Sequence, residues 1–336
     1  MHFNSSQNSS TFVKSDTVFV CAYAPELTWS LNDRTFPWIL LSITFVASPA
    51  TVALNIVVVT AIMKMKELQT NSNLLLCSLV IADLLVGTVN MPLSVAICFL
   101  MVKQVWSQRI CLLDILNVYS MYCFSMSSLF HLTVISWERY VAVVKWIEYK
   151  TIVSRRLIEI MKVAVWLAAL CLTIPALLME ILGLAEKISQ TLYIIWCVVG
   201  TIAIVAIVYF YAMVCIGFRR RKVSKISRVT DLLKVKLESK LAKTSAILTG
   251  SLCLSFFPAI AMFMVGEAFP ILRSSSAFLL WELLMQLNSL ANPLLYCYRN
   301  SRVRNGVKKL FRRNALGLVQ TSIFTCTEPN VSIKYM

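Results

Sequence analysis

The sequence predicts an all-α membrane protein: a bundle of seven transmembrane helices with a short amphipathic helix after the seventh span. Three observations predict it. The 336-residue chain is 58% hydrophobic and only 14% charged, whereas soluble domains carry about 25% charged residues. Seven apolar stretches reach or approach the roughly 20 residues that cross a bilayer. Basic residues are concentrated in alternate connecting segments.

Each apolar stretch predicts one membrane-spanning helix. The loops at 64–71 and 267–273 are short, as expected for antiparallel neighbours in a bundle. Prolines at 49, 92, 175, 258 and 293 fall inside spans, where each removes a backbone donor and bends its helix. The expected spans are 37–63, 72–102, 111–138, 160–182, 188–218, 244–266 and 274–298.

The positive charge predicts the orientation of the chain. With the N-terminus outside, the cytosolic segments hold 26 of the 32 Lys and Arg residues, which is the positive-inside bias. These basic loops face anionic inner-leaflet lipid. A net charge of +16 distributed in this way indicates membrane lipids as partners and argues against nucleic acid.

Three segments follow from these spans. Residues 1–36 form an extracellular tail without the apolar core of a signal peptide, and Asn4 and Asn8 start glycosylation sequons in it. Residues 37–298 form the seven-helix domain. Residues 299–336 form a cytosolic tail in which 302–311 alternates basic and apolar residues. That pattern predicts a short helix on the membrane surface, which Gly306 weakens.

The eleven cysteines do not form a disulfide framework, because most of them lie within spans. Cys21, Cys98 and Cys111 lie near the outer side. The two histidines are too few for a metal site, and His131 within a span is expected to be a hydrogen-bonded packing residue. No metal site is expected apart from the sodium site described below.

Two short motifs end the third and seventh apolar stretches. Glu138-Arg139-Tyr140 closes the third, and Asn292-Pro293-Leu294-Leu295-Tyr296 ends the seventh. An arginine and an Asn-Pro pair are both costly in a bilayer, so polar groups placed there predict function.

These motifs, with four further matches in the right order, resemble a rhodopsin-like (class A) G-protein-coupled receptor over the whole transmembrane length. The further matches are Asn55, Leu79 to Asp83, Trp166 and Pro258. The resemblance implies a multi-pass plasma-membrane receptor, not an enzyme. It implies an extracellular ligand, a heterotrimeric G protein and arrestin as partners, and no cofactor except a sodium ion as allosteric modulator.

The resemblance implies a switch at the cytosolic end. Arg139 is expected to pair with Glu138 or with Glu238, which stands 20 residues before Pro258, and outward motion of the sixth helix releases it. A solvated Glu238 in a charged loop is the alternative. Tyr211 and Tyr296 resemble the paired tyrosines that support the arginine in the active state.

A second set of residues resembles the family's sodium site: Asp83, Ser128, Asn288 and Asn292. An unpaired carboxylate in the membrane core is costly unless it is neutralised. A hard cation held by oxygen ligands neutralises it, and protonation of Asp83 is the competing explanation.

The third helix predicts a path from an outer pocket to the switch. Asp114, Met121, Ser128 and Ile135 repeat every seven residues and share one face, with Arg139 a turn further on. The candidate residues of that outer pocket include two acids. Acidic residues at the outer opening of the bundle favour a basic peptide or a small non-amine ligand. The pocket candidates are Asp114, Asn117, Met121, Phe256 and Glu282.

The chain departs from the family at several positions. Amine receptors carry an aspartate 18 residues before the arginine, where this chain has Met121, and opsins carry a lysine where this chain has Gln286. Asp114 replaces the usual disulfide cysteine. Cys111 therefore pairs with Cys21, the favoured partner, or with Cys98, or stays free. The loop bridge that is missing, Asp114 in its place and a fifth span (188–218) without proline resemble the melanocortin receptors and their adenosine and cannabinoid relatives.

Two other functions stay open. A ligand-independent or heterodimerising receptor-like protein is the first, because Asp114 and Phe256 stand where the family has other residues. A seven-helix transporter is the second, although such proteins carry repeats and charged relays at the membrane midplane that this sequence does not show.

Overall fold

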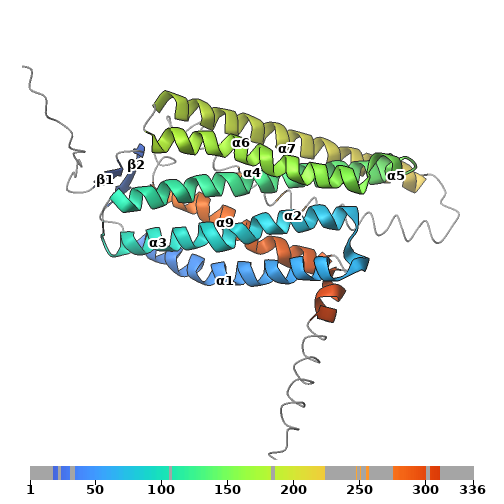
Figure 1. Cartoon of the computed structure of the whole chain (residues 1–336), viewed down its shortest axis with the longest axis horizontal. Coiled ribbons are helices and arrows are strands. Elements are labelled where there is room, and N and C mark those ends of the chain that lie inside the picture. The colour runs from blue at the N-terminus through green and yellow to red at the C-terminus, as the bar shows by residue number, and fades with distance from the viewer. Residues whose placement is uncertain are drawn as a thin grey trace, which may run out of the picture.

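The computed structural model shows one elongated bundle of helices that run roughly along a common direction (Figure 1). A small hairpin lies at one end of the bundle, and a short helix and the α4–α6 connection lie at the other. The structure describes residues 18–21, 24–30, 35–105, 108–182, 186–223, 247, 250, 255–256, 275–299 and 303–310.

The helices agree with six of the expected spans. The first and second spans are α1 (Thr35–Lys64) and the continuous pair α2 (Asn71–Leu85) and α3 (Met91–Val102). The third to fifth are α4 (Gln108–Val144), α6 (Arg155–Ile181) and α7 (Glu186–Val223), and the seventh is α9 (Ser275–Arg299). The expected sixth span, 244–266, lies outside the described residues except for 247, 250, 255 and 256.

Five of the described spans are long and apolar enough to cross a membrane. They correspond to the first five expected helices, from Thr35–Lys64 to Ile194–Gly217. The α9 helix has 25 residues, enough for a crossing at 1.5 Å per residue, but it does not pass the same hydropathy test. Polar side chains such as Glu282 and Gln286 lower its hydropathy, and these side chains are buried.

Local capping explains why two helices begin where they do. The Ser154 hydroxyl accepts a hydrogen bond of 3.1 Å from the Leu157 amide, so α6 starts at Arg155 rather than near residue 160. The Thr70 side chain accepts from Asn73 in the same way at the start of α2. Such caps satisfy amides that have no partner within the helix.

A wide turn interrupts the second span. Residues Val86–Asn90 form a π-helical turn, η2, between α2 and α3, just before Pro92. Proline lacks an amide hydrogen and crowds the carbonyl four residues earlier, so a local π turn relieves the conflict. The turn directs Asn90 into the interior, where its side chain is fully buried.

The N-terminal tail contains structure that the sequence reasoning missed. Strands β1 (Val18–Cys21) and β2 (Ala24–Ser30) pair antiparallel, with Val18 opposite Ser30 and Phe19 opposite Trp29. The β-branched and aromatic residues of both segments favour strands. The tail predicted at 1–36 thus includes two paired strands.

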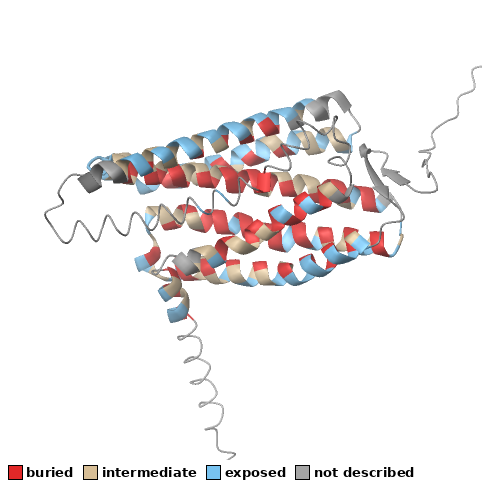
Figure 2. Cartoon of the chain, turned by 180° about the vertical axis from the view of Figure 1, so that it is seen from behind, coloured by how far each residue is buried: buried red, intermediate tan, exposed pale blue. Residues whose placement is uncertain are grey.

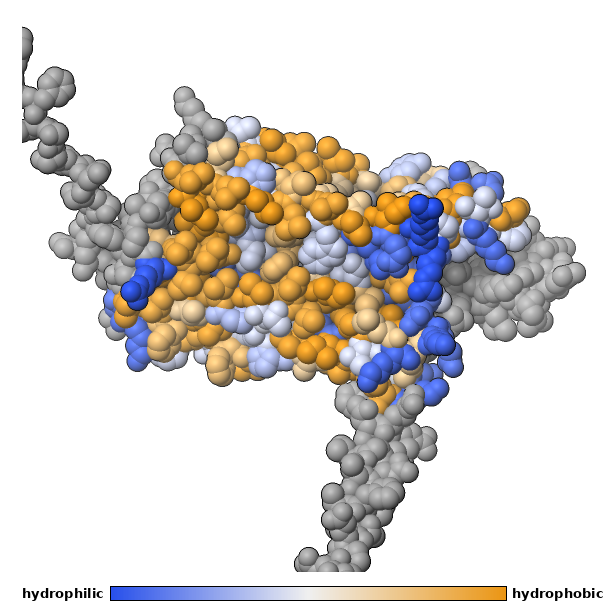
Figure 3. All heavy atoms as spheres, viewed as in Figure 1, coloured by the Kyte–Doolittle hydropathy of each residue, from blue (hydrophilic) through white to orange (hydrophobic). Residues whose placement is uncertain are grey.

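The third span, α4, is the central helix of the bundle, since it contacts α2, α3, α6 and α7. Buried residues face the interior of the bundle, and exposed residues gather on its outer surface (Figure 2). That outer surface is largely apolar along its length, while hydrophilic side chains gather at the two ends (Figure 3). This distribution is what a membrane-embedded bundle requires.

The segment after α9 begins with the expected short helix. Residues 303–310 are helical, and Val303, Gly306 and Leu310 among them are buried. Gly306 lies against Leu68 of the turn η1 (Lys66–Leu68). A β-carbon added to Gly306 would lie 2.6 Å from Leu68 Cδ1. Gly306 therefore permits the close approach of this helix, although glycine lowers its intrinsic stability.

Candidate functional site

The inner end of α4 holds a buried ion pair. The Arg139 Nη2 atom lies 2.5 Å from Glu138 Oε2, and Arg139 Nε donates to the same carboxylate at 2.6 Å. Glu138 is fully buried and Arg139 is 4% exposed. A bidentate pair of this kind is stronger than a surface pair, since solvent does not screen it.

A tyrosine that sequence reasoning missed completes this site. The Tyr149 hydroxyl donates to Glu138 Oε1 at 2.6 Å. Tyr149 begins the short helix α5 (Tyr149–Ile152) in the α4–α6 connection, which the sequence analysis treated only as a basic loop. The carboxylate thus accepts hydrogen bonds from two directions. We call Glu138, Arg139 and Tyr149 the inner ion-pair site.

The other predicted switch residues are placed in part. Tyr140 is half-buried and packs on Phe210, with 5.6 Å between ring centroids. Tyr211 lies half-buried on α7. Pro293 is buried within α9, whereas Glu238 and the side chain of Tyr296 lie outside the described residues.

The predicted sodium-site residues are all buried in the middle of the bundle. Asn292 Nδ2 donates to Asp83 Oδ2 at 2.9 Å, which joins α9 to α2. The second carboxylate oxygen, Asp83 Oδ1, is buried and has no hydrogen-bond partner among the described residues. Ser128 and Asn288 are 4% and 5% exposed. An orphaned carboxylate oxygen next to the Asn292 amide fits a hard cation.

The outer half of the bundle contains a larger polar cluster. Glu282 Oε1 accepts from Asn117 Nδ2 at 2.6 Å, from Gln286 Nε2 at 2.9 Å and from the Ser94 hydroxyl. Gln286 also donates to Asn90 Oδ1 at 3.0 Å. We call these five residues the outer polar cluster; they connect η2, α3, α4 and α9.

Asp114 lies near this cluster but does not share its hydrogen bonds. It is 5% exposed, and its carboxylate accepts no hydrogen bond from the described residues. All the hydrogen bonds to Glu282 end on one oxygen. Among the described residues, the carboxylates of Asp114 and Glu282 therefore each keep at least one oxygen that accepts no hydrogen bond. No basic side chain of the described residues lies against them.

The cysteine geometry decides part of the predicted pairing. Cys111, three residues before Asp114, is disulfide-bonded, whereas Cys98 is a free buried thiol. A Cys98–Cys111 bridge and a free Cys111 are therefore wrong. The Cys21 side chain lies outside the described residues, so its pairing with Cys111 stays a prediction. Asn4 and Asn8 also lie outside them.

Aromatic side chains fill the space between α4, α7 and α9. Tyr122 contacts Trp196 and Trp281, with ring centroids 5.1 Å and 6.0 Å apart. Phe256 stacks on Trp196 at 5.4 Å with an interplanar angle of 19° and is 1% exposed. Phe256 is therefore packed against its neighbours inside the bundle. These four residues form what we call the aromatic cluster.

The predicted face of the third helix is confirmed by burial. Asp114, Met121, Ser128 and Ile135 are between 2% and 5% exposed, and Arg139 follows on the same inward side. This face touches the outer polar cluster, the sodium-site residues and the inner ion-pair site in turn. A rigid helix thus spans the distance between the two ends.

His131 has the packing role predicted for it. His131 Nδ1 lies 2.7 Å from the Ser127 carbonyl oxygen and must donate to it, and Nε2 accepts from the Ser78 hydroxyl at 2.7 Å. Trp166 Nε1 donates to the same hydroxyl at 3.2 Å. These bonds join α2, α4 and α6 with a neutral imidazole.

Three members of the outer polar cluster were not predicted as site residues. Asn90 lies seven residues after Asp83, Ser94 four residues after Asn90, and Gln286 four residues after Glu282. Those spacings place polar side chains on one helix face. Polar periodicity within apolar spans is the signal that finds them.

The chain matches the profile of the 7 transmembrane receptor (rhodopsin family) over residues 54–296, and it belongs to that family. This places it among multi-pass membrane receptors, which are not enzymes.

Relatives include amine and peptide receptors. The 5-hydroxytryptamine receptor 1D of Mus musculus is 26% identical over 86% of this chain and 92% of that receptor. The 5-hydroxytryptamine receptor 2B of Dichotomyctere fluviatilis is 35% identical, but over 41% of this chain and only 28% of that receptor. The Tachykinin-like peptides receptor 99D of Drosophila melanogaster is 24% identical over 84% of this chain and 58% of that receptor. These relatives give no support to the predicted likeness to melanocortin, adenosine and cannabinoid receptors.

Proposed function

We propose that this protein is a plasma-membrane receptor that transmits an extracellular ligand signal to a heterotrimeric G protein. The N-terminal segment 1–36 is extracellular, 37–298 is the receptor domain and 299–336 is cytosolic. The ligand binds the active arrangement of the bundle more tightly than the resting one and so shifts the population. Arrestin and membrane lipids are further partners.

The single observation that carries this proposal is the inner ion-pair site. Arg139 is buried at the inner end of the helix that also touches the outer polar cluster, and Glu138 holds it at 2.5 Å. An arginine in this position serves no packing purpose that an apolar residue does not serve better. Release of Arg139 from Glu138 creates a donor surface for the G-protein α subunit.

The ligand carries a positive charge. Asp114 and Glu282 are both buried and, among the described residues, have acceptor oxygens without hydrogen-bond donors, so a cationic group beside them removes an electrostatic cost. The amine receptors among the relatives fit a cationic ligand, and the Tachykinin-like peptides receptor shows that a relative of this chain is a receptor for peptides. Because Met121 offers no carboxylate, we favour a basic peptide or another small non-amine cation bound by Asp114 and Glu282, with Asn117, Met121 and Phe256 lining the pocket.

A sodium ion modulates the equilibrium from the middle of the bundle. Asp83, Ser128, Asn288 and Asn292 supply its oxygen ligands, and the ion neutralises the Asp83 carboxylate. Substitution of Asp83 by Asn is expected to abolish the effect of sodium on agonist affinity. Agonist affinity that still depends on sodium in this variant counts against the site.

The test of the proposed function is G-protein activation by the purified protein. A screen of basic peptides, purines, lipids and amines with a G-protein dissociation readout identifies the agonist. Arg139→Ala is expected to reduce activation to background, while Arg155→Ala, which removes an exposed arginine at the start of α6, retains it. Signalling that survives Arg139→Ala contradicts the proposal. Basal activation that no agonist changes indicates the ligand-independent alternative.

A further inference from the structure

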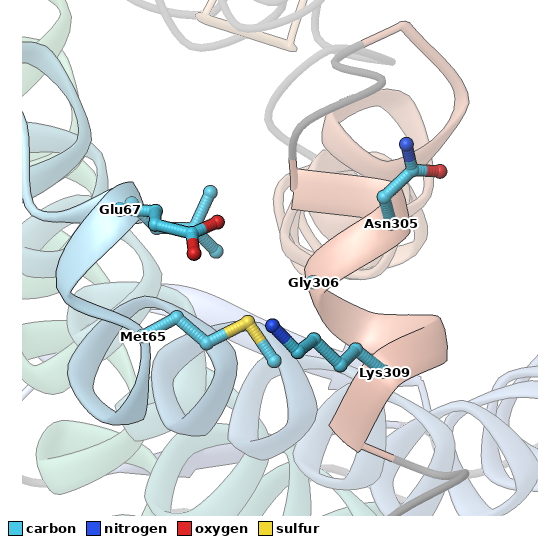
Figure 4. Close-up of a pocket in the computed structure, with 6 residues that line it drawn as sticks. Met65, Glu67, Asn305, Gly306 and Lys309 are labelled. Atoms are coloured by element: carbon cyan, nitrogen blue, oxygen red, sulfur yellow. The ribbon is translucent and has the colours of Figure 1, made fainter.

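The inner end of the molecule contains a groove that the proposed function does not use. It lies between η1, which follows the first span, and the helix 303–310, and its volume is about 380 Å³. Volumes of about 300–1,000 Å³ are typical of small-molecule sites. Figure 4 shows Lys309 reaching across the gap toward Met65, with Glu67 on the opposite side. The lining residues are Met65, Glu67, Leu68, Asn305, Gly306 and Lys309.

Both walls of the groove are held in place. On one side, the Leu68 amide donates to the Met65 carbonyl at 2.9 Å, and Asn73 Nδ2 donates to the Leu68 carbonyl at 2.8 Å. On the other side, Gly306 lies so close that an added β-carbon would be 3.1 Å from Met65 Sδ. The groove is therefore a formed feature of the fold, not a gap between loose loops.

The groove is surrounded by positive charge. Lys64, Lys66, Lys308 and Lys309 are exposed, and none of them has a carboxylate partner in the described part of the chain. Glu67 is the acid that lines the groove, and it makes no ion pair with Lys309 across it. Four lysines against one glutamate favour an anionic occupant.

The position of the groove favours a lipid headgroup over a soluble anion as its occupant. The first span ends at Lys64, one residue before the groove begins, so the groove lies at the level where a bilayer presents its headgroups. Basic pockets beside transmembrane helices on the cytoplasmic side bind phosphorylated lipid headgroups. A soluble cytosolic anion has no such advantage of local concentration.

We propose that this groove binds the headgroup of a phosphoinositide from the membrane leaflet at the inner end of the bundle. The proposal rests on the orientation given under the proposed function. Lys309 binds a ring phosphate. The Glu67 carboxylate accepts hydrogen bonds from ring hydroxyls, and the Asn305 amide donates hydrogen bonds to them. Phosphatidylserine offers neither several phosphates nor ring hydroxyls.

The test uses the full-length protein in detergent, titrated with a short-chain phosphatidylinositol bisphosphate and, in parallel, with short-chain phosphatidylserine. Lys309→Gln is compared with Lys308→Gln, which removes the same charge from the next residue of the same helix but does not line the groove. Lys309→Gln is expected to weaken phosphoinositide binding about fivefold, and Lys308→Gln by less than about twofold. No ligand or G protein enters the assay, so the result does not depend on signalling.

Four results overturn the proposal. Equal losses for the two variants indicate a diffuse surface charge. Equal affinity for phosphatidylserine indicates non-selective attraction to anionic lipid. Tight binding of soluble inositol trisphosphate without preference for the lipid indicates a cytosolic anion as occupant. Absence of binding to the unsubstituted protein indicates that another segment fills the groove.

Discussion

The two ends of the bundle treat buried carboxylates in opposite ways. At the inner end, fully buried Glu138 is neutralised by Arg139 of the same chain. At the outer end, Asp114 and Glu282 are 5% and 4% exposed, yet no basic side chain among the described residues pairs with either, and Glu282 accepts only from amides and a hydroxyl. A buried charge without a counter-ion is costly. The comparison teaches that the inner carboxylate already has its counter-ion, whereas under the proposed function the outer carboxylates receive theirs from a ligand.

The largest expected effect is a loss of agonist potency when an outer carboxylate is removed. Asp114→Asn removes a carboxylate that has no hydrogen-bond partner among the described residues, so it leaves the fold intact and weakens a cationic agonist. Loss of one partner of a buried charge pair costs about 2–5 kcal/mol, so agonist potency falls roughly 30-fold or more. G-protein activation curves measure it.

Glu180→Gln provides the matched control for Asp114→Asn. Glu180 is a half-buried acid near the outer end of α6 that Tyr119 contacts at 3.4 Å. We expect its substitution to change potency by less than about threefold, since a group open to solvent interacts weakly. Equal losses at both positions indicate general electrostatic attraction in place of a defined cation site.

A smaller effect, on basal nucleotide exchange, is expected when Glu138 loses one hydrogen bond at the inner end. Tyr149→Phe removes one of the hydrogen bonds to Glu138 and leaves the ion pair with Arg139. A hydrogen bond to a charged group contributes about 1.5–3 kcal/mol when buried; because Tyr149 is only half-buried, we expect ligand-free nucleotide exchange to rise a few-fold. Unchanged basal exchange, measured on purified receptor, shows that Tyr149 does not restrain the switch.

The smallest effect concerns the region between the two ends. Ser78→Ala removes the hydroxyl shared by His131 and Trp166 and leaves both without this partner, which costs about 1–3 kcal/mol. Thermal unfolding is expected to begin a few degrees lower, while agonist potency and basal exchange stay the same. A change in signalling without a change in stability shows that this junction belongs to the switch.

The sequence predicted the parts of the molecule that depend on local pattern. Hydropathy predicts the described spans to within a few residues, and motif spacing predicts that Asp83 and Asn292 meet and that Arg139 is buried beside Glu138. The α6 helix begins at Arg155, earlier than the predicted residue 160, because Ser154 caps it. The hairpin at 18–30 was missed because the chain was treated as a polar tail.

The rest of the site depends on tertiary placement that spacing along one helix does not contain. Tyr149 reaches Glu138 only because the α4–α6 connection folds into a helical turn. Gln286 contacts Asn90 because the π turn before Pro92 rotates that side chain inward. The groove at Gly306 lies between two segments more than two hundred residues apart in the sequence. The sequence predicts only that Gly306 weakens its helix, whereas the structure shows that it permits close packing against Leu68.

The most direct test of the central claim is ligand-free nucleotide exchange by the Glu138→Gln variant, alone and combined with Arg139→Ala. Loss of the carboxylate frees Arg139, so basal exchange is predicted to rise about tenfold, and the added Arg139→Ala is predicted to abolish the increase. Exchange by Glu138→Gln no faster than that of the unsubstituted protein, at equal amounts of folded protein, contradicts the account.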